Sequence, residues 1–171
     1  HDLWNGRDKS TDPLSFFDQY FEKNPTSFKD GSIEFIFIDN SDLYNGVPEA
    51  ELEKIIDTIQ TSTSSTIIIL SHKAIKHPLT IHTMGYIDDE QNELVYSQAE
   101  RLDQVIKSIR DKNIYLVHGD LHSFGQYTVD NITSFGIGAL TEDKNYQQPR
   151  YAIGIIDKSG KLHMQDRPIS P

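Results

Sequence analysis

The sequence contains no cysteine, which excludes disulfide bonds and metal sites built on thiolates. It also lacks a long apolar run, since no stretch approaches the roughly 20 residues that a membrane-spanning helix needs. No charged and then apolar leader is visible at the start of the chain. We therefore expect a soluble protein without a membrane partner. The lack of cysteine leaves the cellular compartment open.

Basic residues are scarce, with 16 Lys and Arg against 26 Asp and Glu and a formal net charge of −10. A protein that binds nucleic acid needs a positive patch for the phosphate backbone, and the sequence shows no cluster of Lys and Arg. Nucleic acid is therefore not expected as a partner. Small phosphate esters are still possible ligands, because divalent cations held by carboxylates supply local positive charge.

The length and the hydrophobic pattern predict a single domain over residues 1–171. Short apolar strands alternate with amphipathic helices, which is typical of an α/β fold. Strands are expected at 33–39, which we expect to be buried on both faces, and at 67–70 and 114–117. Helices are expected from Asp12, from Pro48, and from a capping box formed by Ser97 and Glu100.

The end of the chain alternates apolar and polar residues in short pieces separated by turn residues, which predicts antiparallel hairpins. These pieces are 126–129, 132–137, 151–156 and 161–164. The segment 73–95 has no clear periodicity and contains His77 and His82. A segment this long without regular structure is more often a lid or a specificity loop than a plain connection.

Polar side chains follow three of the expected strands at the point where each strand ends. Asp39 and Asn40 follow the first strand, His72 follows the second, and Asp120 and His122 follow the third. Parallel strands bring such ends to one edge of a sheet, where α/β proteins build their sites. Carboxylate and imidazole groups suit borderline divalent metals, so a metal site is one reading. Capping of the strand ends by the same groups is the other.

Two of these strand ends resemble motifs of the calcineurin-like metallophosphoesterases. The segment Ile67–His72 is similar to the strand-then-histidine motif of that family, and Val117–His122 is similar to its late Gly-His-x-His motif in a Gly-Asp-x-His variant. The opening His1–Asp2 matches the second half of the Gly-Asn-His-Asp/Glu motif. The resemblance covers the chain as the C-terminal half of that domain, because the early Asp-x-His and Gly-Asp-x-x-Asp motifs have no counterpart.

The resemblance implies a layered sheet sandwich flanked by helices, with C-terminal antiparallel hairpins. It also implies hydrolysis of a phosphate ester, on a small molecule or a protein, at a site with two divalent metal ions such as Mn, Fe or Zn. His72, Asp120 and His122 would be metal ligands, and His1 would be the general acid with Asp2 orienting its ring. An upstream segment would complete the site.

The substrate would be contacted by the long segment, where His77 and His82 are the candidate side chains. Two alternatives remain. One is a catalytically incomplete, phosphoesterase-like domain that serves as a binding scaffold. The other is a loop of the haloacid-dehalogenase type at 35–42, in which Ser41 stands where that family has a second carboxylate. His118 is expected inside its strand with hydrogen bonds to its ring, and His163 is expected to be structural.

Overall fold

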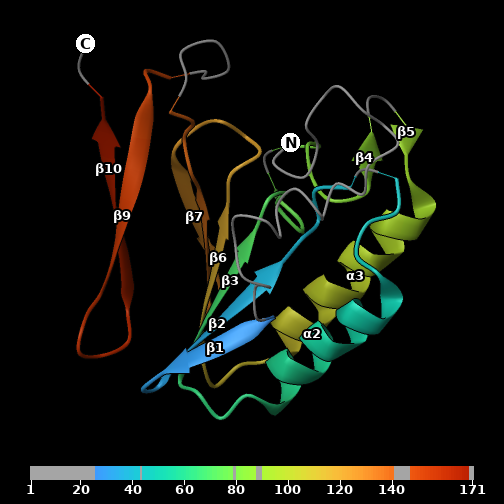
Figure 1. Ribbon diagram of the computed structural model, residues 1–171. Coiled ribbons are helices and arrows are strands. Elements are labelled where there is room, and N and C mark those ends of the chain that lie inside the picture. The colour runs from blue at the N-terminus through green and yellow to red at the C-terminus, as the bar shows by residue number, and fades with distance from the viewer. Residues whose placement is uncertain (1–25, 43, 79, 88–89, 141–146, 170–171) are drawn as a thin grey trace, which may run out of the picture.

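The computed structural model describes residues 26–42, 44–78, 80–87, 90–140 and 147–169. The helix expected from Asp12 and the site residues His1 and Asp2 lie outside this described part. Within it, the chain forms a mixed α/β structure, as expected (Figure 1). None of its helices is both long enough and apolar enough to cross a membrane.

The centre of the molecule is a six-stranded sheet in the order β1-β2-β3-β6-β8-β7. Its strands are β1 (Ser27–Asp30), β2 (Ile33–Ile38), β3 (Thr66–Ser71), β6 (Asn113–His118), β8 (Ile132–Gly136) and β7 (Gly125–Val129). The four inner strands run parallel, and β1 and β7 pair antiparallel at the two edges. The predicted strands at 33–39, 67–70 and 114–117 are thereby confirmed. Their carboxyl ends meet at one edge.

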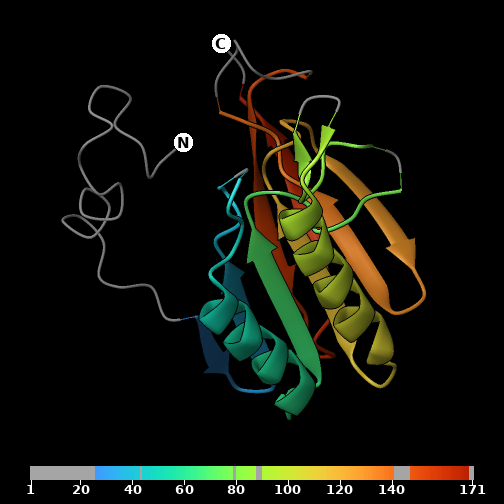
Figure 2. The same cartoon turned by 90° about the vertical axis from the view of Figure 1, so that its right-hand side faces the viewer.

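Two helices, α2 (Glu49–Thr61) and α3 (Glu93–Ser108), cover one face of this sheet. Figure 2 shows them side by side across the strands. The apolar stripe of α2, formed by Leu52, Ile55 and Ile59, is fully buried against sheet residues such as Ile67 and Ile69. Burial of one helix stripe on alternate strand residues is what the 3.6-residue and 2-residue periods predict.

A second, two-stranded sheet lies on the opposite face (Figure 1). It is an antiparallel hairpin of β9 (Arg150–Ile156) and β10 (Leu162–Pro168). Leu162 packs with Ile68, Tyr115 and Phe135, which point away from the helices. Both faces of the central strands are therefore covered, one by helices and one by the hairpin.

Burial of β2 differs from the sequence prediction. Ile36 and Ile38 are buried on the helix face, whereas Phe35 and Phe37 on the other face are only partly buried. Phe28 of β1 stacks on Phe35 with ring centroids 4.6 Å apart and stays largely exposed. The prediction of a strand buried on both faces was therefore wrong for one face, because an edge hairpin rather than a full layer covers it.

The start of α3 also corrects the sequence prediction. Asn92 is the N-cap and accepts a hydrogen bond from the N–H of Val95 through its side chain. Ser97, the predicted capping residue, lies inside the helix and donates its hydroxyl to the carbonyl of Leu94. The segment expected to be a loop also contains a short antiparallel pair, β4 (Tyr86–Ile87) and β5 (Glu90–Gln91).

The late hairpins β7–β8 and β9–β10 are antiparallel, as predicted. The sequence pattern did not show that β8 also pairs with β6 in the parallel sense. Local alternation is the same for both pairings, because either one buries every second residue.

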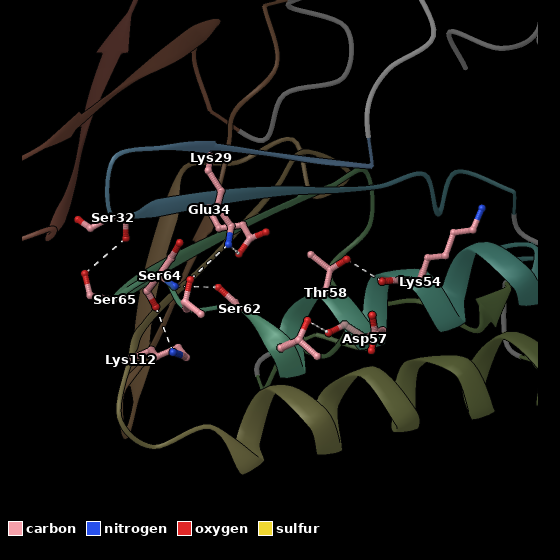
Figure 3. A network of polar contacts seen from close by, with 12 residues as sticks. Lys29, Ser32, Glu34, Lys54, Asp57, Thr58, Ser62, Ser64, Ser65 and Lys112 are labelled. Carbon is pink, nitrogen blue, oxygen red and sulfur yellow. Dashed lines mark hydrogen bonds and ion pairs between the residues drawn. The ribbon is translucent and has the colours of Figure 1, made fainter.

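Polar contacts tie the amino ends of the strands together (Figure 3). Lys29 lies 3.6 Å from the buried carboxylate of Glu34, and Lys112 donates to the carbonyl of Ser64 at 3.1 Å. The backbone N–H of Ser64 in turn donates to the Ser62 hydroxyl. These contacts lie at the edge of the sheet opposite the carboxyl ends of the parallel strands, where the polar residues singled out by the sequence are found.

Candidate functional site

The loops that follow β2, β3 and β6 are tied to one another by hydrogen bonds. The fully buried side chain of Asn40 donates to the carbonyl of Lys73 and accepts from its N–H, each at 2.9 Å. The carbonyl of His72 accepts from the N–H groups of Gly119 at 3.0 Å and Asp120 at 2.9 Å. The three strand ends that the sequence singled out therefore form one connected rim.

His72 and Asp120 meet directly on this rim. The Nε2 atom of His72 lies 3.3 Å from Oδ1 of Asp120, and their side chains are 32% and 21% exposed. Burial pushes the pKa of Asp120 up. The hydrogen bond from His72 and the electrostatic interactions with Lys73, His72 and His122 outweigh burial, so this pKa lies below its usual value. The carboxylate is therefore held in its charged form next to an imidazole that solvent reaches.

His122 lies in a tight turn just beyond this pair. Its backbone φ of 48° is in the left-handed region, which costs a residue other than glycine about 1–2 kcal/mol. Its N–H donates to the carbonyl of Gly119 at 3.2 Å, which closes the turn. The turn that carries Asp120 and His122 is therefore closed by a backbone hydrogen bond.

The donor set supports only part of a metal site. No group of three or more His, Cys, Asp or Glu side chains in the described ranges has an arrangement that could hold an ion. Zinc-type sites take three or four protein ligands, so the pair of His72 and Asp120 is insufficient by itself. The predicted residues His1 and Asp2 are outside the described part. The described residues alone therefore do not make a complete metal centre.

Asp39, at the end of β2, has a structural role in its loop. Its Oδ1 accepts from the N–H of Ser41 at 3.2 Å and from the hydroxyl of the same serine at 2.6 Å. Such bonds are typical of an Asx turn. This arrangement matches the capping interpretation of the strand end.

The two histidines expected to contact substrate lie in different surroundings. The ring of His77 packs edge-on against Tyr127, with centroids 4.5 Å apart, and against His118 at 5.9 Å. His82 is exposed and packs edge-on against Tyr86 at 6.2 Å. His77 lines a pocket beside the rim, and His82 is not among the residues that line this pocket.

His118 is inside β6, as predicted, but its ring is not hydrogen-bonded. It is 2% exposed, and neither ring nitrogen has a hydrogen-bond partner among the described residues. Burial, and next the electrostatic interaction with His77, lower the pKa of His118 to about 4 against the opposing effect of Asp120. The prediction of hydrogen bonds was wrong because an inward position at a strand end places the ring among packed side chains.

Sequence reasoning missed Lys73 and Tyr127. Lys73 is buried, and its charge lowers the pKa of Asp120. The hydroxyl of Tyr127 donates to the carbonyl of Lys76 at 3.0 Å, which joins β7 to the loop after β3. Lys73 directly follows His72 at the end of a predicted strand, and this position could have marked it as a candidate site residue. No local signal marks Tyr127, because its partner is 51 residues away.

Comparison with protein-family models gives no match, and neither does comparison with curated protein sequences. Among solved structures, the chain is similar to one described as the structure of PhoD, with 13% identity, a TM-score of 0.47, and 68% of this chain and 28% of that one covered. It is also similar to GAP50, the anchor in the inner membrane complex of Plasmodium, with 12% identity, a TM-score of 0.43, and coverage of 85% and 53%.

A third similar structure is a putative 5'-nucleotidase from Staphylococcus aureus in complex with alpha-ketoglutarate. The identity is 11% and the TM-score 0.42, with 83% of this chain and 28% of that one covered. The chain therefore spans between 28% and 53% of the length of these three structures.

Proposed function

We propose that this chain forms part of a hydrolytic site for phosphate esters, as the C-terminal half of a metallophosphoesterase-like domain built as a layered sandwich. The observation that carries the proposal is the pairing of His72 with Asp120 at 3.3 Å across the ends of β3 and β6. These two positions lie in the two segments that resemble the family motifs. A partly exposed imidazole and a charged carboxylate at the carboxyl ends of parallel strands are typical of α/β active sites.

In this proposal the chain's own residues hold and orient the reacting groups. His72, Asp120 and His122 are ligands for divalent ions of the Mn, Fe or Zn kind. His1 and Asp2, outside the described residues, are the proposed general acid and the group that orients it. The ions would polarise the phosphate and lower the pKa of a bound water. The missing ligands come from outside the described residues, in this chain or in an upstream segment.

A binding scaffold is the second candidate function. His72 and Asp120 pair with each other, and the loops that carry them are joined by two backbone hydrogen bonds. These contacts hold the rim together without an ion, because His72 and Asp120 serve as partners for each other. A scaffold of this kind needs the shape of the rim but no reaction.

A phosphatase assay separates the two functions. The purified protein is incubated with Mn²⁺ and either p-nitrophenyl phosphate or bis(p-nitrophenyl) phosphate. We expect Mn²⁺-stimulated hydrolysis that falls on the order of 100-fold in His72→Ala and in His122→Ala, because loss of a ligand exceeds the 10–100-fold cost of losing a supporting residue. His163→Ala is the matched control, since this exposed histidine pairs with Asp157 on the distant hairpin.

Hydrolysis that survived both ligand substitutions would contradict the enzymatic proposal. If the protein hydrolyses neither substrate, calorimetric titration with Mn²⁺ tests whether the site binds metal. Binding at a defined stoichiometry that both substitutions abolish supports a metal site, whereas no stoichiometric binding supports the scaffold.

A further inference from the structure

A pocket of about 340 Å³ lies beside the rim, between the loop after β3 and the first turns of α3. Its lining includes Lys76, His77, Thr83, Met84, Tyr86 and Tyr96. Figure 1 shows β4 at the amino-terminal end of α3, on the side of the sheet where the parallel strands end. The volume falls in the range of pockets that bind small molecules, which is about 300–1,000 Å³.

Backbone contacts hold the pocket wall in place. The N–H of Met84 donates to the carbonyl of Ala74 at 2.8 Å, and the N–H of Asn92 donates to the carbonyl of Gly85 at 2.6 Å. Gly85 has a φ of +89°, and a side-chain carbon there would lie 2.6 Å from the backbone of Tyr96. The segment that carries Met84 and Tyr86 is therefore seated on α3 before any ligand binds, which lowers the cost of binding.

The lining suits a planar ring without charge. Tyr86 and Tyr96 offer aromatic surfaces, and the buried thioether of Met84 adds a polarisable contact, both of which favour aromatic groups. Lys76 is the lining cation, and it pairs with Glu100 while its ammonium lies 5.3 Å from the centroid of the Tyr96 ring. The carboxylate therefore offsets the charge of Lys76, which leaves little attraction for a phosphate inside the pocket.

His77 joins the pocket to the rim. Burial lowers its pKa, which favours the neutral imidazole. Its ring lies 5.9 Å from that of His118, which interacts electrostatically with both His77 and Asp120. Tyr127 holds the other side of His77 at 4.5 Å. His77 therefore lines the pocket and also contacts His118, which lies two residues before Asp120 in the chain.

We propose that this pocket binds the uncharged aromatic or heteroaromatic group of a phosphate ester whose phosphate is held at the rim by His72, Asp120 and His122. The assignment of the phosphate rests on the function proposed above. The assignment of the ring rests on the pocket alone. The substrate class is therefore an aryl phosphate or a nucleotide rather than a sugar or alkyl phosphate.

Binding is tested with adenosine, which has the ring but no phosphate, so the outcome does not depend on catalysis. The chain has two methionines, Met84 in the pocket and Met164 on the hairpin. With ¹³C-methyl methionine, NMR titration should give a saturable shift of the Met84 signal and none of the Met164 signal. Ribose, which lacks the ring, should shift neither.

Substitutions of Tyr96 test whether its ring contacts the bound adenosine. Tyr96→Ala should weaken adenosine binding at least tenfold, while Tyr96→Phe, which keeps the ring, should retain it within about threefold. Tyr151→Ala is the matched control, because Tyr151 is 46% exposed on the hairpin and Tyr96 is 39% exposed. In the hydrolysis assay, Tyr96→Ala should lower kcat/KM for phenyl phosphate at least tenfold more than it lowers kcat/KM for methyl phosphate, because only phenyl phosphate has a ring for the pocket to bind.

The possible results separate the two proposals. No saturable Met84 shift, equal shifts of both methionines, or unchanged affinity in Tyr96→Ala would overturn the pocket assignment whatever the hydrolysis assay shows. Adenosine binding at Met84 in a protein that hydrolyses no phosphate ester would uphold the ring site and overturn only the catalytic proposal.

Discussion

Two imidazoles at the carboxyl edge differ in what surrounds them. His72 faces a carboxylate at 3.3 Å and is partly exposed, whereas His118 is buried without a hydrogen bond to either ring nitrogen among the described residues. Leaving a buried polar group unsatisfied costs about 1–3 kcal/mol. His118 is tolerated because its neutral form needs no counter-charge, whereas its protonation would place a charge in the buried interior.

Acid should destabilise the protein through His118. Its pKa falls from 6.5 to about 4 on folding, so between these values the unfolded state binds more protons than the folded state. The stability from this group is fully present above pH 6.5 and is lost progressively as the pH falls to about 4. The loss should be about 3 kcal/mol, at 1.36 kcal/mol for each unit of pKa. Urea unfolding at pH 7 and pH 4, in buffer with EDTA, measures it.

The control for this prediction is a second histidine. His118→Phe should remove most of the pH dependence, while His163→Phe, on the exposed hairpin, should retain it. If His118→Phe lost stability with acid as steeply as the wild type, another group would be responsible.

At the level of elements, α3 shows what determines the residue at which a helix begins when two N-cap candidates are present. Both Asn92 and Ser97 are residues that favour N-caps, and Ser97 is followed three residues later by Glu100. Asn92 is the cap because it also donates to the carbonyl of Tyr44 at 2.8 Å, and because its own N–H reaches the carbonyl of Gly85. Contacts outside the helix thus decided between two local signals.

Substitution of these two residues tests the helix start. Asn92→Ala should lower the free energy of unfolding by about 1–2 kcal/mol, since it removes a cap and a contact with Tyr44. Ser97→Ala should change it by less than about 0.5 kcal/mol, because Ser97 is exposed inside the helix. Urea unfolding monitored by circular dichroism measures both. An equal cost for the two substitutions would indicate that α3 begins at Ser97 in solution.

In the whole molecule, the sheet is held between two helices on one face and one hairpin on the other. The helix side buries many aliphatic residues, whereas the hairpin side depends on a smaller set around Leu162, Tyr115 and Phe135. Two hydrogen bonds between described residues also join the hairpin to the rest of the molecule: the N–H of Arg150 donates to the carbonyl of Ala139 and the hydroxyl of Thr66 donates to the carbonyl of Gly160, each at 3.0 Å. The position of the hairpin therefore depends on a few side chains and these two bonds.

Leu162→Ala should loosen the hairpin from the sheet. Leu162 is 6% exposed and points to the sheet, so its truncation should cost about 2–4 kcal/mol. Ile155→Ala is the control, because Ile155 is 45% exposed and should cost less than about 1 kcal/mol. Hydrogen exchange should quicken in β9 and β10 in Leu162→Ala while α2 stays protected. Equal exchange in the two variants would show that the hairpin is held elsewhere.

Much of the fold could be predicted from local pattern. The apolar runs of β2, β3 and β6 and the stripe of α2 follow from residue types and spacing within one element, so they needed no tertiary information. The polar residues that end those strands were found for the same reason. The pattern could not predict that β8 pairs with β6 in the parallel sense. A strand shows the same alternation of apolar and polar residues whether its neighbour is parallel or antiparallel.

The sequence by itself therefore determined where β2, β3 and β6 lie and which polar residues stand at their ends. Tertiary structure decided that His72 meets Asp120, that the ring of His118 is buried, and that Met84 and Tyr96 wall a pocket beside His77. His72 and Asp120 are far apart in the chain, and two parallel strands with the helix between them bring them together. Such contacts depend on packing across the whole sheet, which no local period encodes.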